Sequence, residues 1–595
     1  MVIYDTRNPL LRIGSFSAFY GDRPDAMALH LDDGCDVLVG DYLAELTMLI
    51  LRKNQLRGRP GYAPSFVSQL AANLDRVAET GVRIITNAGG LDPEGCAQAV
   101  RALCAERGLD IVVAAVVGDN LREELEGPLG QELELTNMDT GEVLDISNIE
   151  VLTANAYLGA WPIVEALDAG AQIVICPRMT DASVLVGPAA WHFGWGREDW
   201  DQLAGAVVAG HLVECGGQVT GGNYARFFEH PSLGIAGLPV AEIDKDGATV
   251  ISKLSNSGGL VTVDTVKAQL FYEIGGTEYL NPDVITDIAS VELTDLGDNR
   301  VRVSGVRGRT PTPSTKLSLT YEGGYRNTMT IGITGLHVAE KFAWLQEQIE
   351  TLVGSPDSFD GYRWTLVGPS RPSDGDYGES TALAVLHIRD RDPKKVSRRA
   401  FSDKVVQLAL ASIPGFYLTT PPGDARLFGV QWPCLIEKSR ITTAVRIHGR
   451  DDVVVPWGPM APMTPTAPAG GEGAATMLDG PTVDLPLGAL ALARSGDKGG
   501  SANIGVWART AEGYSWLRDY LTEARLAELM PEARGLRVVR HDFPNLQGLN
   551  FVLYGYLEEG VSSCTRIDPQ AKGLAEYLLS KTVPLPVGLA PAGNG

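Results

Sequence analysis

The sequence lacks the features that mark several large classes of protein. Its seven cysteines, among 595 residues, are odd in number and show no paired spacing, so we expect reduced thiols and no disulfide framework. No apolar run approaches the length of a membrane span, and no basic segment followed by an apolar one opens the chain, which favours a cytoplasmic protein. There is no GxGxxG after a predicted strand and no GxxxxGK followed by Ser or Thr, so neither a dinucleotide nor a nucleoside triphosphate is implied.

Basic residues are scarce relative to acidic ones. The chain carries 50 Lys and Arg against 73 Asp and Glu, a formal net charge of −23. Such a field disfavours nucleic acid and anionic membranes as partners. An anionic ligand would therefore need a local basic patch.

The chain length and a hydrophobic fraction of 44% predict several folded domains. Residues 1–237 alternate short apolar runs with helical patterns at 42–54, 93–107 and 162–168, which predicts an α/β lobe with a parallel sheet. The candidate strands of this lobe are LLRIG, CDVLVG, VRIITNAG, IVVAAVVGD and AQIVIC.

The rest of the chain predicts two further units. Residues 238–452 are rich in strand patterns with helical stretches at 337–353 and 397–413, and are interpreted as a mixed α+β second lobe. Residues 453–485 have the Pro/Gly-rich composition of a linker. Residues 486–588 follow a β-β-α-β-β-α order, which predicts a small C-terminal α+β two-layer sandwich with a tail at 589–595.

Polar residues follow one of the predicted buried strands directly. AQIVIC leads into Arg178, Thr180 and Asp181, and in open α/β sheets ligands bind beyond the carboxyl ends of the strands. We expect these three side chains to contact substrate. The structural alternative is that Asp181 caps the next helix while Arg178 pairs with a carboxylate; both can hold together.

The following helix carries chemically active side chains where its apolar pattern calls for apolar ones. The face marked by Trp200 and Val207 continues to His211, Glu214 and Cys215. His211 and Glu214 are spaced to share a proton, which favours general acid and base catalysis; a structural hydrogen bond is the equally weighted alternative.

Cys215, one turn after His211, is a possible nucleophile, although a free cysteine is more often a small buried apolar residue. His211, Glu214 and Cys215 match none of the usual zinc spacings, so no metal is predicted.

Other polar or Gly-rich turns are predicted at the same edge of the sheet. Their backbone or side chains are expected to contact substrate, and they include Asp41, Asn87, Gly89, Gly90 and Asn223. In the small domain, Lys498 lies in the turn RSGDKGGSAN and is a candidate for binding an anionic group, although turn chemistry alone explains its Gly, Asp and Ser neighbours.

Several long segments together resemble the acyclic terpene utilisation family typified by AtuA. They include CDVLVGDYLAELTM, ITNAGGLDPEGC, ANAYLGAWPIVEALDAGAQIVICPRMTDAS and AGHLVECGGQVTGGN, while LARSGDKGGSANIGV resembles the small companion domain. The resemblance covers a main domain at 1–452 and the C-terminal domain. It implies breakdown of acyclic terpenoids and other branched acids through coenzyme A thioesters.

We therefore expect an enzyme that acts on a branched acyl-CoA or carboxylic acid, most simply a hydratase or dehydratase that uses Asp181, His211 or Glu214 for proton transfer. Thioester hydrolysis or acyl transfer through Cys215 or an activated water is one alternative, and a non-catalytic acyl-CoA binding or scaffold protein is another. No tightly bound cofactor is expected, coenzyme A enters as part of the substrate, and the chain is expected to form a homo-oligomer.

Overall fold

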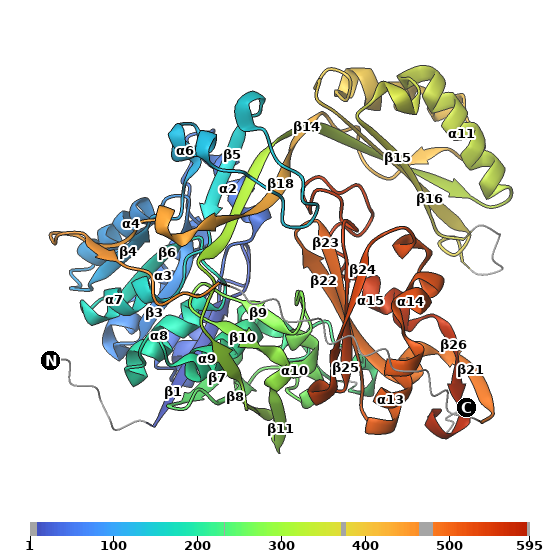
Figure 1. Cartoon of the computed structure of the whole chain (residues 1–595). Helices are drawn as coiled ribbons and strands as arrows, with labels where there is room; N and C mark the ends of the chain where they lie inside the picture. Colours follow the sequence, from blue (N-terminus) through green and yellow to red (C-terminus); the bar gives the residue numbers. More distant parts are fainter. Residues whose placement is uncertain (1–8, 231, 370–375, 463–479, 592–595) are drawn as a thin grey trace.

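The computed structural model describes residues 9–230, 232–369, 376–462 and 480–591, and its largest sheet has eleven strands (Figure 1). Five central strands are parallel and lie in the order β1 (Leu10–Ser17), β2 (Val37–Gly40), β3 (Arg83–Gly90), β6 (Ile173–Pro177) and β4 (Val113–Val117). These are the five strands that the apolar runs predict. The α/β fold class is therefore confirmed.

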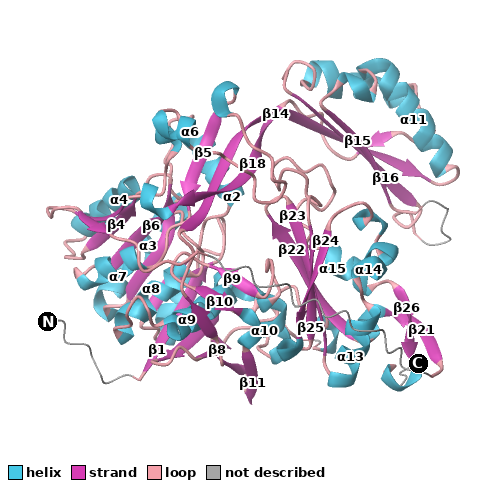
Figure 2. Cartoon of the chain, viewed as in Figure 1, coloured by secondary structure: helices cyan, strands magenta, loops and turns pink. Residues whose placement is uncertain are grey.

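Each central strand is buried on both faces, which explains its continuous apolar sequence. Ile173 and Ile175 pack in one core with helices α3 (Pro64–Thr80) and α4 (Pro93–Glu106). Val174 and Cys176 pack in the opposite core with α7 (Trp161–Asp168), α8 (Ser183–Phe193) and α9 (Trp200–Glu214). Helices thus cover both faces of the sheet (Figure 2).

The boundary expected at residues 237 and 238 does not separate two lobes in space. Beyond β1 the main sheet continues with β7 (Pro239–Asp244), β8 (Thr249–Lys253), β12 (Arg300–Ser304) and β11 (Glu292–Gly297). Beyond β4 it continues with β19 (Thr443–Ile447) and β20 (Val453–Val455). Strand patterns predict that these segments pair, but they carry no information on which sheet edge receives them.

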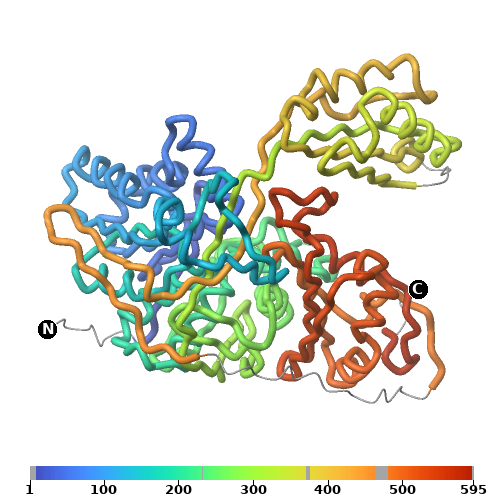
Figure 3. The backbone as a smooth tube through the Cα atoms, turned by 45° about the horizontal axis from the view of Figure 1, so that its top comes forward, coloured from blue at the N-terminus to red at the C-terminus, as the bar shows by residue number. Residues whose placement is uncertain are grey.

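A second sheet is built around β14 (Ser314–Thr334), which pairs with β5 (Val151–Ala156), β18 (Arg426–Glu437) and β16 (Thr381–Asp390). β14 runs through Gly323 and Gly324 with a register shift where a turn had been expected. Beyond this point β14, β16, β15 (Gly361–Val367) and α11 (Val338–Val353) enclose a separate small core. This outer lobe projects away from the main sheet (Figure 3).

The expected linker, 453–485, begins with structure. β20 pairs with β19, and the indole of Trp457 donates to the carbonyl of Ile441 at 3.1 Å. Residues 463–479 lie outside the described residues. At the other end β21 (Thr482–Pro486) pairs with β26 (Thr582–Pro586) of the small domain.

The small domain has the predicted two-layer α+β order. Its sheet runs β22 (Ala491–Lys498), β23 (Ser501–Ala508), β25 (Gly548–Leu553) and β24 (Val538–Phe543), with helices α13 (Ala511–Tyr520), α14 (Glu523–Leu529) and α15 (Leu574–Leu579). Leu517, Ile504 and Phe551 lie in its core. In the part of the chain that the structure describes, no helix is long and apolar enough to span a membrane.

The small domain docks on the segment that follows α10 (Val263–Leu270). Phe271 stacks on Trp507 with ring centroids 5.8 Å apart, and Gly505 and Gly548 leave room for its ring, because a Cβ at either would lie within 2.5 Å of it. Asn503 donates to the carbonyl of Phe271 at 2.6 Å. This docking brings the β22–β23 turn to the main domain.

Candidate functional site

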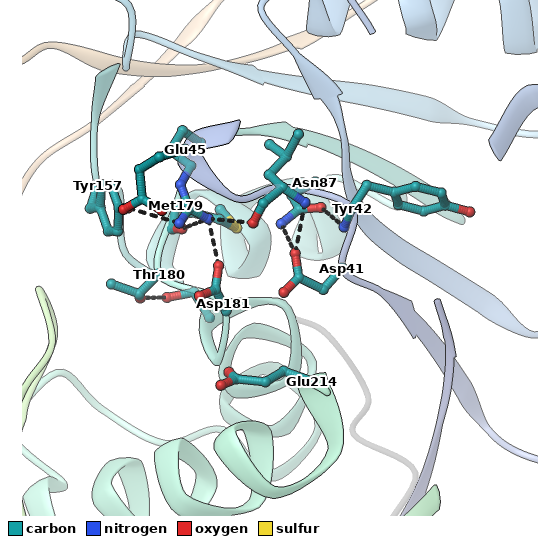
Figure 4. Close-up of polar contacts among 12 residues, drawn as sticks. Asp41, Tyr42, Glu45, Asn87, Tyr157, Met179, Thr180, Asp181 and Glu214 are labelled. Atoms are coloured by element: carbon teal, nitrogen blue, oxygen red, sulfur yellow. Dashed lines mark hydrogen bonds and ion pairs between the residues drawn. The ribbon is translucent and has the colours of Figure 1, made fainter. Parts of the chain in front are cut away.

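The candidate site lies at the carboxyl ends of the parallel strands, as expected. Asp41 follows β2 and Asn87 lies in the last turn of β3 (Figure 4). The Asn87 amide donates to Asp41 Oδ1 at 2.5 Å and accepts from the backbone N–H of Tyr42 at 2.7 Å. Asn87 therefore positions Asp41, and its expected contact with substrate stays a prediction.

Arg178 is the centre of this network and is buried. Its Nη1 donates to Asp181 and to the carbonyls of Leu43 and Met179, and its Nη2 donates to the Tyr157 hydroxyl at 2.8 Å. Asp181 does not cap α8, which begins at Ser183 without a side-chain cap. Arg178 thus pairs with Asp181 and leaves only Nε without a hydrogen-bond partner.

Sequence reasoning missed three neighbours of Arg178. The Tyr157 hydroxyl donates to Glu45 Oε1 at 2.7 Å, and Lys316 Nζ reaches the same oxygen at 2.9 Å. Burial raises the pKa of Glu45, but the charges of Lys316 and Arg178 outweigh it and hold that pKa well below its usual value. Lys316 comes from β14, 271 residues away in sequence, so no local pattern signals this contact.

His211 and Glu214 form the predicted pair near the end of α9, a helix buried on all sides from Leu203 onward. His211 Nδ1 lies 3.0 Å from Glu214 Oε1, and the two side chains are 2% and 8% exposed. Burial lowers the pKa of His211 to about 4, and burial together with Asp181 raises that of Glu214. Both shifts favour the uncharged forms, the neutral imidazole of His211 and the protonated carboxyl of Glu214.

One polar atom of each member of this pair is free. His211 Nε2 and Glu214 Oε2 are buried and have no hydrogen-bond partner among the described residues. Buried polar atoms without partners are uncommon and costly. They are available for a substrate.

Three carboxyl groups, Asp41, Asp181 and Glu214, point toward the same space (Figure 4). Burial and the charge of Asp181 raise the pKa of both Asp41 and Glu214, and Arg178 opposes this. The Asp181 side chain keeps 28% of its surface exposed. The raised pKa values of Asp41 and Glu214 favour their protonated forms beside Asp181, which is paired with Arg178, so the site can hold an acid and a base together.

The small domain adds charged groups to the same region. Lys498, at the end of β22, donates to the carbonyl of Glu273 at 3.0 Å, and its side chain is exposed. Burial and Asp497 raise the pKa of Glu273 to about 7, and burial raises that of Asp497 to about 6. Glu273 and Asp497 were not predicted as site residues, because their proximity depends on domain docking.

Cys215 follows α9 but lacks the surroundings of a nucleophile. Burial, with the charges of Glu214 and Glu273, raises the pKa of its thiol. Nδ1 of His211 already contacts Glu214, so it does not serve as a base for Cys215. The charge of Lys572 opposes the rise in the thiol pKa without reversing it, so the thiol form is favoured over the thiolate that a nucleophile needs.

The remaining predicted positions have structural explanations. A Cβ on Gly89 would lie 2.6 Å from the carbonyl oxygen of Cys176, and Gly90 has φ +52°. Asp92 caps α4 through the N–H of Gly95, so this helix start is already satisfied. Thr180 bonds Ser183 at 2.6 Å, and Asn223 is an exposed turn residue with φ 57°, outside the hydrogen bonds described for the cluster.

Comparison with known protein families agrees with this architecture. The family of the acyclic terpene utilisation protein AtuA matches residues 11–447, and the AtuA ferredoxin-like domain matches 485–584. The chain belongs to the AtuA family, as its sequence segments predict, and membership implies a role in acyclic terpene utilisation. Comparison with curated proteins and with solved structures gave no match.

Proposed function

We propose that the protein is a hydratase or dehydratase of a branched, unsaturated or hydroxylated acyl-CoA or carboxylic acid. The observation that carries the proposal is the buried Glu214, with a free Oε2 and a raised pKa, beside Asp181, which is paired with Arg178. Addition of water to a double bond needs one group that accepts a proton and one that donates it. These two carboxyl groups supply both.

In the hydration direction, Asp181 takes a proton from water as the oxygen bonds to the carbon β to the substrate carbonyl. The carbon next to the carbonyl receives a proton from Glu214, and one water is added overall. Dehydration reverses both transfers. An Nδ1–H of His211 that donates to Glu214 Oε1 over 3.0 Å leaves the Glu214 proton on the free Oε2, so His211 acts as a positioning residue.

Two groups are suited to the polarised carbonyl that this chemistry develops. Lys498 donates to the carbonyl of Glu273, and partial loss of hydration together with the charge of the nearby Lys316 lowers its pKa. Arg178 keeps Nε unpartnered. A cation at this point stabilises the negative charge that forms on the oxygen.

Thioester hydrolysis by water that Glu214 or Asp181 activates is the alternative within enzymes. The raised pKa of Cys215 weighs against its covalent form. A non-catalytic acyl-CoA binding protein is the alternative outside enzymes. The free polar atoms of His211 and Glu214 favour an enzyme, because a scaffold gains nothing from them.

The deciding experiment incubates the protein with branched and unsaturated acyl-CoA thioesters and the free acids, and follows products by mass spectrometry. A product heavier or lighter by one water is expected. Release of free coenzyme A would replace the proposal with a hydrolase or transferase. An unchanged panel with a raised melting temperature would indicate a binding protein.

The Glu214→Gln variant tests the residue assignment. Glutamine keeps an oxygen that can accept from His211, but it cannot release a proton, so turnover should fall at least about 100-fold with little change in melting temperature. Glu198→Gln, an exposed change just before the same helix, should keep full turnover. Normal turnover in folded Glu214→Gln would remove Glu214 from the mechanism.

A further inference from the structure

The C-terminal end of α2 (Glu45–Gln55) and the loop after it carry cations without acidic partners. Arg52, Lys53, Arg57 and Arg59 form no ion pair with an Asp or Glu among the described residues, although the chain as a whole carries 23 excess negative charges. In such a protein, cations find acidic partners easily. Their isolation here indicates a site for an anion.

Two of these arginines, Arg52 and Arg59, line a cavity of about 420 Å³ together with Arg122. Arg52 Nε is buried and lacks a hydrogen-bond partner. The cavity also has apolar surface from Leu91, Leu152 and Pro60, and two acidic residues, Asp92 and Glu123. Asp92 caps α4, and Arg122 pairs with Glu126 at 2.7 Å, so Arg52 and Arg59 are the two cavity arginines without a carboxylate partner among the described residues.

The other two cations extend the positive field along the same helix end. Lys53 donates to the carbonyl of Leu427 at 2.9 Å, and burial together with Arg326 and Arg57 lowers its pKa. Arg326 lies directly opposite Arg426 in the β14–β18 pair, an arrangement that destabilises a sheet unless an anion offsets it. The dipole of α2 favours cations in its last turn, but Arg59 and Arg326 lie beyond that turn.

The cavity and the candidate active site lie along the same helix. α2 begins at Glu45, which bonds Tyr157, and reaches Arg52 seven residues later, about 10 Å along the axis. Asn120, which lines the cavity, directly follows Asp119, whose Oδ2 accepts from the backbone N–H of Arg178. One elongated ligand can therefore span both.

We propose that the cavity lined by Arg52, Arg59 and Arg122 binds the phosphate groups of the substrate, namely the phosphorylated nucleotide end of a coenzyme A thioester. Guanidinium groups bind phosphate through paired, charge-assisted hydrogen bonds, and the mostly polar lining of this cavity suits a ligand end that carries several phosphate oxygens. This assignment rests on the proposed function, because it places the far end of the same substrate.

The test measures binding of adenosine 3′,5′-bisphosphate, ADP and inorganic phosphate by calorimetry, at low and physiological salt. The native protein should bind the two nucleotides more tightly than phosphate, with affinity that falls as salt rises. Arg52→Gln/Arg59→Gln should weaken nucleotide binding at least tenfold, and Arg52→Lys/Arg59→Lys should weaken it less. Arg399→Gln, a change at an exposed arginine of the outer lobe, should leave the nucleotide affinity unchanged.

Turnover separates this inference from the proposed function. If thioesters are turned over, the glutamine variant should raise their KM about tenfold with kcat unchanged, and a pantetheine thioester should show no difference between variant and native protein. If the native protein binds the nucleotides, the glutamine variant does not, and no thioester is turned over, then the proposed function is wrong but the anion site stands. A native protein that binds neither nucleotide, or a folded glutamine variant that binds them normally, overturns the site.

Discussion

At the scale of single residues, the site contains carboxyl groups whose pKa values are raised by burial. Asp119 is the simplest example, since it is 3% exposed and belongs to no ion pair in the described part of the chain. Its Oδ2 accepts from the Asn155 amide at 2.6 Å and from the N–H of Arg178 at 3.3 Å. Burial still raises its pKa to about 7.

This pKa gives Asp119 a calculable effect on stability. The folded protein binds the proton more tightly than the unfolded chain, in which the carboxyl has its ordinary pKa of 3.8, so the Asp119 contribution is lost as pH rises from about 4 to about 7. Asp119→Asn should remove this loss. The difference between the free energy of unfolding of Asp119→Asn and that of the native protein should rise by on the order of 2–4 kcal/mol from pH 4 to pH 8.

Urea unfolding of both proteins across that pH range measures the difference. The lowered pKa of His211 changes stability with pH in the opposite direction, but His211 is present in both proteins, so its effect cancels in the difference. A difference between the two proteins that is independent of pH would show that Asp119 is ionised throughout.

At the scale of elements, the strand ends position the site by close packing. The end of β3 approaches β6 and the start of α4 so closely that only glycine fits at residue 89. The same residue was expected to contact an anion through its backbone. The close contacts around Gly89 explain the glycine by packing, so a variant at this position can distinguish a packing role from an anion-binding role.

Gly89→Ala should destabilise the protein by about 1–3 kcal/mol, because the new Cβ would lie 2.6 Å from the Cys176 carbonyl oxygen and 2.8 Å from Pro93 Cα. Gly127→Ala is the matched control, since its nearest atom would be 3.4 Å away. Chemical unfolding measures both. Equal stability of the two variants, with ligand binding lost only in Gly89→Ala, would restore the anion-binding role.

At the scale of the whole molecule, docking of the small domain completes the charged cluster. Phe271 is 1% exposed, stacks on Trp507 and meets the edge of Phe543 at 5.4 Å. The residues after it, Tyr272 and Glu273, contact Lys572 and Lys498. Packing at Phe271 therefore controls the placement of Lys498.

Phe271→Ala should cost about 3–5 kcal/mol of unfolding free energy, the usual cost of truncating a buried phenylalanine. It should also raise amide hydrogen exchange in β23 and β25, where the small domain meets the main domain. Phe228→Ala, at a side chain that is 62% exposed, serves as the control. Unchanged exchange in β23 and β25 would show that docking does not depend on Phe271.

Local sequence pattern was sufficient for the parallel strands, for the polar residues at their ends and for the pair of His211 and Glu214. Each depends on periodicity within one segment: a continuous apolar run, a helical face, or a polar residue that interrupts it. The order of elements in the small domain follows from the same rules. Family membership likewise follows from contiguous segments.

Only the tertiary structure decided which distant groups share the site. Lys316 reaches Glu45 across 271 residues, and Lys498 reaches Glu273 across 225. Likewise, only the tertiary structure showed that β7, β8, β11, β12, β19 and β20 join the first sheet, since pairing between distant edges leaves no periodic signal in either segment. Local propensity determines what an element is; burial and charge in the assembled fold determine what it meets.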